Sequence, residues 1–207
     1  MLDKDIREQI IALIKRQVVP AVGCTEPMAV ALCTARATED MGRRPEKIRV
    51  LLSGNMLKNA MGVGIPGTGM IGLPIAVALG AIVGKSQYQL EVIKDLTPEK
   101  LEEGKAFIAD PHRIDIKLKE NITEKLYIEV TCSAGDDSAT AVIAGSHTNF
   151  VYECCNGKVL LDKRQCTEDT EEHKGVDLDM KTVWEFATTT PLEEIAFMEE
   201  ARDYNIR

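Results

Sequence analysis

Apolar residues recur at helical spacing near both ends of the chain and through its first half. Over residues 3–18, isoleucine, leucine and valine return every three or four positions between charged and amide side chains, which predicts a one-sided helix. Segment 26–41 is rich in alanine and predicts a second helix that packs closely against a neighbour. Segment 72–84 is almost wholly apolar but too short to cross a bilayer, so we expect it in the core. Further helices are predicted over 55–61, 97–109, 180–188 and 191–204.

Alternation of apolar and polar residues predicts strands elsewhere. One strand is expected early, over 47–53, and a closely spaced series follows over 113–119, 126–132, 139–145, 149–155 and 158–161. Asn156-Gly157 separates the last two strands and is a strong signal for a tight hairpin. This series predicts an antiparallel meander, and the acidic stretch 165–179 after it predicts an exposed loop. Because helices and strands are segregated, the predicted fold class is α+β. It has amino-terminal helices and one early strand, then a mostly antiparallel sheet closed by carboxy-terminal helices.

Composition narrows the class of protein. The chain has 207 residues, 44% of them hydrophobic and 28% charged, as expected for one ordinary globular domain over 1–207. The net charge of −8 disfavours nucleic acid and anionic membrane as partners. The start of the chain does not resemble a signal peptide, and no apolar run has membrane-spanning length. Six cysteines without framework spacing favour a reducing, cytoplasmic location.

The segment between the first two predicted helices concentrates special residues. Pro20 ends the first helix, Gly23 permits a sharp bend, and Thr25 and Pro27 suit the start of the next helix. Cys24 is therefore expected just outside a helix N-terminus, where the helix dipole lowers the pKa of a thiol and favours the thiolate. A small buried cysteine in a helix–turn–helix is the alternative interpretation.

A glycine-rich stretch, 62–69, matches the G-x-G-x-x-G dinucleotide fingerprint literally. A genuine fingerprint follows a strand directly and opens a helix, whereas a helical segment precedes this one and Pro66 lies inside it. We favour a nest of backbone N–H groups for a carboxylate or phosphate, with a tight structural turn as the alternative. The residues that would form the nest are Gly64, Gly67, Thr68 and Gly69.

Four segments together carry a resemblance. They are Pro-Ala-Val-Gly-Cys-Thr-Glu-Pro at 20–27, Asn-Met-Leu-Lys-Asn at 55–59, the run from Pro66 to Ile75, and Gly-Ser-His-Thr-Asn at 145–149. They resemble the L-cysteine desulfidase family, which is related to the iron–sulfur L-serine dehydratases and has many members labelled serine dehydratase alpha chain. The resemblance covers essentially the whole chain. Family chains continue for roughly as long again, into a half with three cysteines that bind a [4Fe-4S] cluster, so this chain resembles the amino-terminal, serine-dehydratase-beta-like half.

The resemblance implies a reaction and a set of site residues. Hydrogen sulfide is eliminated from L-cysteine, or water from L-serine, and 2-aminoacrylate becomes pyruvate and ammonia. Cys24 matches the proton acceptor. The cluster would be bound by cysteines outside this chain, so no metal is expected here and the isolated chain should be inactive or nearly so. Candidate substrate-binding residues are Asn55, Lys58, Asn59, Gly67, Thr68, Gly69, His147 and Thr148. Two alternatives to substrate binding stay open. Residues 55–59 could be a solvated helix face, and His147 could be a structural histidine.

The remaining candidates are weaker. Glu26 is interpreted as an acid favoured by the helix dipole. Cys154, Cys155 and Cys166 lack zinc-ligand spacing and are interpreted as structural, while His112 and His173 are expected in surface turns. Expected partners are an amino-acid substrate and the carboxy-terminal half or subunit, with a homodimer as a further candidate. Two functions outside catalysis stay open: a regulatory module that binds a small anion or carboxylate, and a subunit that only forms an interface.

Overall fold

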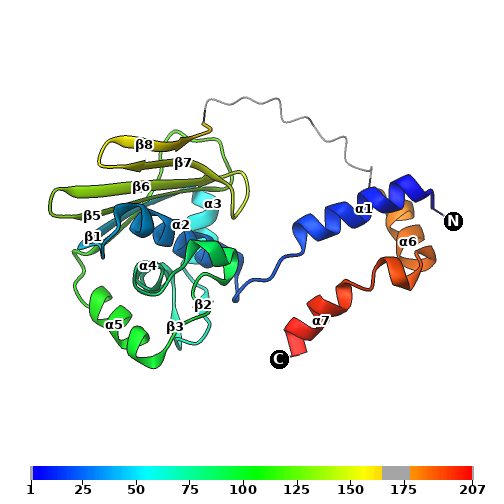
Figure 1. Ribbon diagram of the computed structural model, residues 1–207, viewed down its shortest axis with the longest axis horizontal. Helices are drawn as coiled ribbons and strands as arrows, with labels where there is room; N and C mark the ends of the chain where they lie inside the picture. The colour runs from blue at the N-terminus through cyan, green and yellow to red at the C-terminus, as the bar shows by residue number, and fades with distance from the viewer. Residues whose placement is uncertain (1, 165–177, 207) are drawn as a thin grey trace. The chain divides into compact units, whose positions relative to one another are not determined.

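A computed structural model of the chain describes residues 2–164 and 178–206 (Figure 1). These residues form two compact units. One, called here the helical unit, combines Met1–Pro20 with Cys166–Arg207, and the other, the sheet unit, is Ala21–Gln165. The division into two compact units does not test whether residues 1–207 form one domain, so that stays a prediction. Cys166, His173 and most of the loop expected over 165–179 lie outside the described residues.

The sheet unit is built on a six-stranded sheet with the order β4-β1-β5-β6-β7-β8. Its strands are β1 (Lys47–Leu52), β4 (Ile114–Leu118), β5 (Tyr127–Ala134), β6 (Asp137–Ala144), β7 (Phe150–Cys155) and β8 (Lys158–Asp162). Neighbouring strands from β1 through β5 to β8 are antiparallel, so the α+β fold with a mostly antiparallel sheet is confirmed.

The strand expected over 113–119 forms, but its place in an antiparallel meander is wrong. It is β4, and it pairs with β1 in parallel, Ile48 opposite Ile114. A parallel pair needs a long crossover connection. The chain between β1 and β4 supplies one through α3 (Gly54–Ala60), α4 (Leu73–Ile82) and α5 (Pro98–Ile108).

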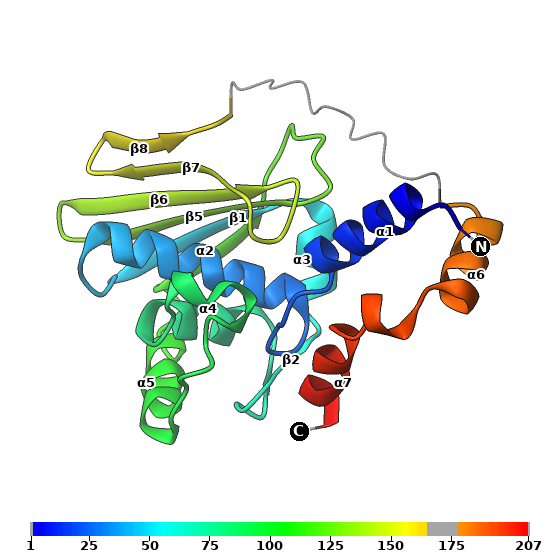
Figure 2. The ribbon, with the colours of Figure 1, turned by 45° about the vertical axis from the view of Figure 1, so that its right-hand side comes forward.

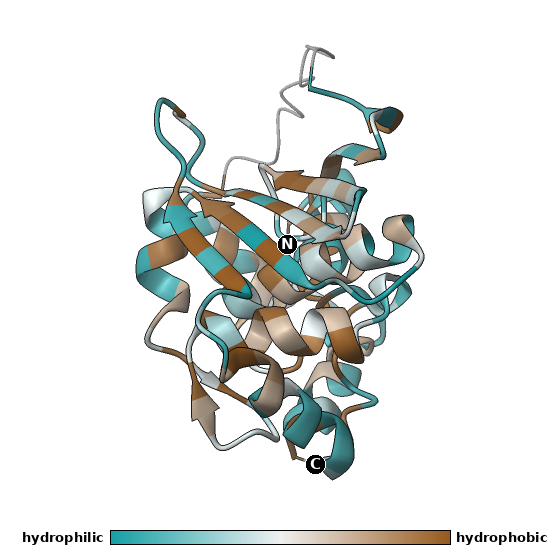
Figure 3. Cartoon of the chain, turned by 90° about the vertical axis from the view of Figure 1, so that its left-hand side faces the viewer, coloured by the Kyte–Doolittle hydropathy of each residue, from teal (hydrophilic) through white to brown (hydrophobic). Residues whose placement is uncertain are grey.

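Helices cover one face of the sheet (Figure 2). The long helix α2 (Thr25–Met41) packs on β5 and β6, and α4 packs on α2. Alternate strand residues such as Ile48, Val50 and Val130 are buried beneath these helices, which explains the alternating hydropathy along the strands in Figure 3. The 3-10 helix η1 (Ser86–Glu91) follows α4, and the glycine-rich stretch forms a small hairpin of β2 (Gly64–Ile65) and β3 (Met70–Ile71).

Helices α2 and α4 approach each other closely through small residues, as the alanine-rich pattern predicts. A Cβ atom placed on Gly80 of α4 would lie 2.5 Å from the Ala31 carbonyl oxygen and 3.0 Å from Cβ of Thr34. Ala31 and Thr34 on α2 are fully buried. The contact is therefore backbone against backbone, with no flexible side chain to give way.

A charged cluster lies where α2 meets β7. Arg36 Nε lies 3.5 Å from Glu153 Oε1, and the guanidinium stacks over the Phe150 ring. One turn further along α2, burial first and then the charge of Glu153 raise the pKa of Asp40 from 3.8 to about 6. Oδ2 of Asp40 is buried and has no hydrogen-bond partner among the described residues.

We expect Asp40 to make stability depend on pH. Folded Asp40 holds its proton more tightly than the unfolded chain does, so its contribution to the free energy of unfolding falls as pH rises from about 4 to about 6. Asp40→Asn should gain stability relative to the parent protein across this window, by on the order of 1 kcal/mol because the carboxyl is only partly buried. Urea unfolding at pH 4.5 and at pH 7.5 measures the difference.

A control that should not change over this window is available on β8. The hydrogen bond from Arg164 lowers the pKa of Asp162, so its stabilising effect is complete above the pKa of an unfolded aspartate, about 4. Asp162→Asn should therefore differ from the parent protein by nearly the same amount at pH 4.5 and at pH 7.5. If Asp40→Asn and the parent protein change in parallel over the window, the account of Asp40 is wrong.

The helical unit contains α1 (Lys4–Gln17), α6 (Met180–Thr189), the 3-10 helix η2 (Leu192–Glu194) and α7 (Met198–Ile206). The guanidinium of Arg7 on α1 donates to both carboxylate oxygens of Glu194, at 3.2 Å each. The single helix predicted over 191–204 is wrong, since the chain turns as a short 3-10 helix and leaves helical geometry at Ile195 before α7 begins. No helix in the described ranges has the length and apolar character needed to cross a membrane.

Candidate functional site

One end of the sheet gathers several of the predicted site residues. In the strand register Leu52 lies opposite Ile128, Ile128 opposite Ile143, and Ile143 opposite Phe150. The end of β1, from which α3 departs, therefore lies at the same sheet end as the 145–149 loop between β6 and β7. Asn55, Lys58 and Asn59 belong to α3, and His147 and Thr148 belong to that loop.

Helix α2 begins at this same end. The thiol of Cys33 lies 3.9 Å from the carbonyl oxygen of Ile128, near the start of β5, whereas Oγ1 of Thr38 contacts Sγ of Cys132 further along the strand, at 3.6 Å. The helix thus runs in the same direction as β5. Its N-terminus, with Cys24 as the N-cap residue, lies towards the sheet end that carries α3.

The Cys24 side chain pairs with a carboxylate. Sγ of Cys24 donates a hydrogen bond to Oε2 of Glu26 at 3.0 Å, and Oγ1 of Thr25 donates to the same oxygen at 3.2 Å. Nδ2 of Asn59 donates to Oε1 of Glu26 at 3.3 Å. Three donors from α2 and α3 therefore converge on Glu26, which joins Cys24 to Asn59.

This pairing reverses the predicted titration of Cys24. The hydrogen bond to Glu26, followed by burial, raises the pKa of the Cys24 thiol, so the prediction of a lowered pKa is wrong. The same hydrogen bond lowers the pKa of Glu26, with help from Asn59 and Thr25. The carboxylate takes the position next to the helix N-terminus and keeps the negative charge there. At neutral pH the site is a thiol donating to a carboxylate.

We expect Glu26→Gln to shift the reactivity of Cys24 to lower pH. A neutral amide no longer stabilises the thiol form or repels the thiolate, so the pKa of Cys24 should fall. Alkylation by iodoacetamide, followed at Cys24 by peptide-resolved mass spectrometry over pH 6 to 10, measures the midpoint. Glu46→Gln, which changes an exposed acid outside this site, should leave the midpoint in place. A midpoint that rises in Glu26→Gln contradicts the pairing.

The glycine-rich hairpin lies against the chain beside Cys24. A Cβ on Gly23, whose φ is +77°, would lie 2.5 Å from Cγ of Pro66, so only glycine fits this close approach. The N–H of Val22 donates to the carbonyl oxygen of Leu90 at 3.1 Å and anchors the same segment. Two segments that the sequence suggested as one site are thus in contact. A cavity of about 410 Å³, lined by Val22, Pro66, Gly67, Lys94, Leu96 and Leu101, opens beside them.

Within the hairpin, Thr68 stabilises the turn through hydrogen bonds to its backbone. Its hydroxyl donates to the carbonyl oxygen of Ile65 at 2.6 Å and accepts from the N–H of Met70 at 2.9 Å. Its own N–H also donates to Ile65, at 3.2 Å, so this N–H is not free for a nest. Gly67 and Gly69 take left-handed φ values of +75° and +66°, as the tight-turn interpretation expects.

The other predicted residues are dispersed around the sheet end. Asn55 lines a second cavity, of about 760 Å³, with Ser53, Lys119, Asn121 and Lys125. Lys58 is exposed on α3, and His147 and Thr148 are half-buried in their loop. Glu26 is the residue whose role sequence reasoning missed. The sequence feature that could have revealed this role is an acid two positions after the cysteine, at a helix start where both side chains lie close together.

The described cysteines do not form a site for an iron–sulfur cluster. Cys33 on α2 and Cys132 on β5 are fully buried, and Cys154 and Cys155 are neighbours on β7, away from Cys24 in the chain. Among residues 2–164 and 178–206, no group of three or more His, Cys, Asp or Glu side chains is placed to hold a metal ion. A cluster bound outside this chain stays a prediction.

Comparison with known proteins finds longer relatives. The chain is 62% identical over 205 residues to a UPF0597 protein from Phocaeicola vulgatus, covering 99% of this chain and 47% of the relative. It is 64% identical over 192 residues to one from Bacteroides thetaiotaomicron, covering 93% of this chain and 44% of the relative. It is 40% identical over 204 residues to one from Dichelobacter nodosus, covering 98% of this chain and 47% of the relative. No protein-family model and no solved structure matches. The chain is thus similar to UPF0597 proteins and spans about half the length of the curated relatives it matches.

Proposed function

We propose that this chain is the amino-terminal half of a cytoplasmic deaminating lyase that eliminates hydrogen sulfide from L-cysteine or water from L-serine. The observation that carries the proposal is the Cys24–Glu26 pair, a thiol with its proton acceptor already in place and held by Asn59. The resemblance of the 20–27 and 55–59 segments to L-cysteine desulfidases supports the choice of reaction.

The pair supplies a base for the α-proton. Glu26 Oε2 accepts the proton of Cys24 Sγ, and the thiolate then removes the proton from Cα of the substrate. The electron pair of the Cα–H bond forms the Cα=Cβ bond while the Cβ–S bond breaks and sulfur leaves as hydrosulfide. For serine, the Cβ–O bond breaks instead, and the oxygen leaves as water with the proton that Glu26 accepted. The product 2-aminoacrylate tautomerises to an imine, and water hydrolyses the imine to pyruvate and ammonia.

The resting thiol form suits this role. A permanent thiolate at Cys24 would be open to alkylation and oxidation, whereas a thiol paired with Glu26 becomes basic only when the proton moves to the carboxylate. Asn59 and Thr25 keep Glu26 in position for that transfer. In this proposal the substrate carboxylate is bound at this sheet end by residues from α3 (Lys58 and Asn55) and from the 145–149 loop (His147 and Thr148). Activation of the leaving group belongs, in this proposal, to the half that the chain does not span, together with the [4Fe-4S] cluster.

The test is complementation between two halves. The 207-residue chain is mixed anaerobically with the portion of the Phocaeicola vulgatus relative that lies outside the aligned residues, supplied with iron and sulfide. Sulfide release from L-cysteine and pyruvate formation from L-serine are then measured. Turnover by the mixture, with neither half active alone, is the expected result. Absence of turnover together with thermal stabilisation of this chain by phosphate or acetate would instead identify an anion-binding regulatory module.

A further inference from the structure

The helical unit exposes an unusual share of large apolar side chains. Ten of the fifteen exposed large hydrophobic residues of the described chain belong to it, although it holds only about a quarter of the described residues. Leu2 and Ile10 are its only described hydrophobic residues that are buried. Exposed apolar patches of this kind mark interaction surfaces.

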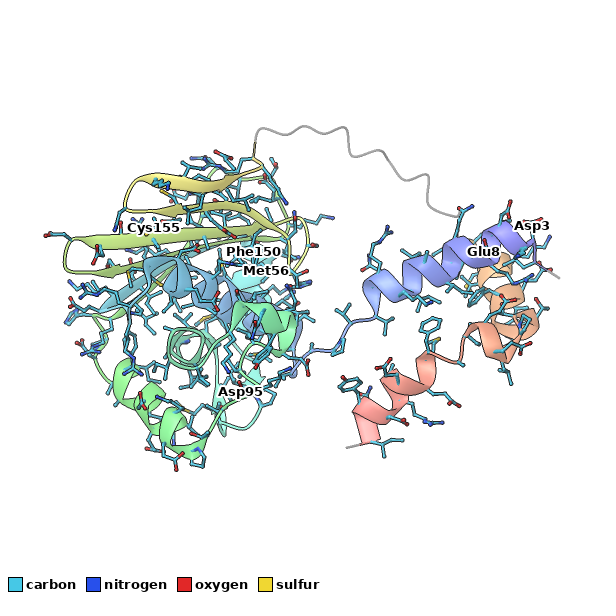
Figure 4. All side chains as sticks on the ribbon, viewed as in Figure 1. Asp3, Glu8, Met56, Asp95, Phe150 and Cys155 are labelled. Atoms are coloured by element: carbon cyan, nitrogen blue, oxygen red, sulfur yellow. The ribbon has the colours of Figure 1, made fainter. Side chains whose placement is uncertain are left out.

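The exposure is concentrated on one side of α6. Met180, Val183 and Trp184 are 80%, 44% and 69% exposed, and their spacing of three and four residues places them in one stripe along the helix. Thr182, Phe186 and Thr189 on the other side of α6 are half-buried. The helix therefore packs through one side and presents the three residues, called here the α6 stripe, on the other. Figure 4 draws the described side chains on the ribbon, including those of α6.

We propose that the α6 stripe, together with Leu192 (78% exposed), binds the half of the polypeptide that the relatives carry and this chain does not span. Alignments covering 93–99% of this chain cover only 44–48% of the relatives' lengths, so the relatives have additional sequence of about equal size. This inference rests on the length of the relatives and on exposed apolar surface, and it holds whether or not the lyase reaction is correct.

The size of the surface favours an attached half over a second copy. A stable complex between separate proteins buries roughly 1,200–2,000 Å² in total, which is more than four side chains supply. A segment in the same polypeptide is present at a high effective concentration, so a small apolar contact is enough to hold it. The separated halves should consequently bind each other weakly but measurably.

Trp184 offers a direct probe, because it is the only tryptophan in the chain. Labelling with 5-fluorotryptophan gives one ¹⁹F resonance, which reports whether the stripe is exposed to solvent. The unlabelled second half of the Phocaeicola vulgatus relative is titrated into the labelled 207-residue chain, and the same samples are run by analytical ultracentrifugation. In the free chain we expect the resonance of a solvent-exposed tryptophan. As a one-to-one complex forms, the resonance should shift and the ring should become protected from solvent.

Two variants with a matched control test the surface itself. Val183→Glu and Leu192→Glu should each weaken binding by roughly 30-fold, as expected when a central apolar contact is lost. Leu160→Glu changes a similarly exposed residue on β8 (48%) and should leave the dissociation constant unchanged. Circular dichroism confirms that each variant is folded.

Three outcomes would overturn the proposal. A resonance that changes with the concentration of the labelled chain alone would assign the stripe to a second copy. If Trp184 is already protected from solvent in the free monomer, the α6 stripe packs against another part of this chain. No response to the second half would show that the stripe is not its binding surface. Because binding rather than turnover is measured, failure of the lyase assay does not affect the result.

Discussion

Cys24→Ala should lower sulfide release from L-cysteine by roughly 10²–10⁴-fold in the complemented two-half protein, the usual contribution of a positioned base. The loss should fall on kcat, because the thiol is proposed to act on the α-proton while α3 and the 145–149 loop hold the substrate. Cys24→Ser keeps a hydroxyl donor beside Glu26, but a serine hydroxyl is far less acidic than a thiol. It should therefore be nearly as inactive.

The assay needs a control on a second cysteine. Cys154→Ser changes a half-buried cysteine on β7 that plays no part in the proposed reaction, so it should retain parental turnover. The sedimentation of the complex should be unchanged in all three variants, which separates loss of chemistry from loss of assembly. Normal turnover by Cys24→Ala would remove Cys24 from the mechanism and leave the complex itself intact.

Gly80→Val should strongly destabilise the sheet unit. Any Cβ on Gly80 meets the backbone of α2 at Ala31, and valine adds two methyl groups in a space that holds none. Helices α2 and α4 would have to separate, which opens voids between fully buried side chains such as Leu32 and Leu79. Overpacking of a core typically costs 1–3 kcal/mol and sometimes more. We expect about 3 kcal/mol in urea unfolding followed by circular dichroism.

Gly64 provides the matched control. A Cβ at Gly64 meets no heavy atom within 4 Å, so Gly64→Ala should change the free energy of unfolding by less than about 0.5 kcal/mol. Gly80→Ala should fall between the two, because its single methyl group already collides with Ala31. If Gly80→Val unfolds at the same urea concentration as the parent protein, the close contact between α2 and α4 is not a determinant of stability.

Several features of the fold were predictable because they depend on neighbours in the chain. Helical periodicity located α1, α2 and α5, and the alternation of polar and apolar residues located β1 and β5 to β8. Asn156-Gly157 marked the β7–β8 hairpin. The position of Cys24 at the start of α2 followed from Pro20, Thr25 and Pro27. In each case the relevant interactions span only a few residues, so the local pattern contains the information.

The predictions from sequence were wrong where the structure depends on residues distant in the chain or on the orientation of individual side chains. A period of two shows that residues 114–118 form a strand, but it does not say which strand lies beside them, and β4 pairs in parallel with β1. The dipole argument at Cys24 considered the backbone alone. The pKa of its thiol is instead set by the Glu26 carboxylate, whose orientation depends on Asn59 from a different helix.

The sequence by itself thus determined the α+β class, most element boundaries and the two segments, 20–27 and 62–69, that meet beside Cys24. Only the tertiary structure decided the edge position of β4, the contact of Gly23 with Pro66, the rise in the pKa of Cys24 and the apolar stripe left exposed on α6. The physical reason is the range of the forces involved. Backbone hydrogen bonding and periodic burial act along the chain, whereas strand partners, carboxylate orientation and unburied apolar surface depend on which remote residues the folded chain brings together.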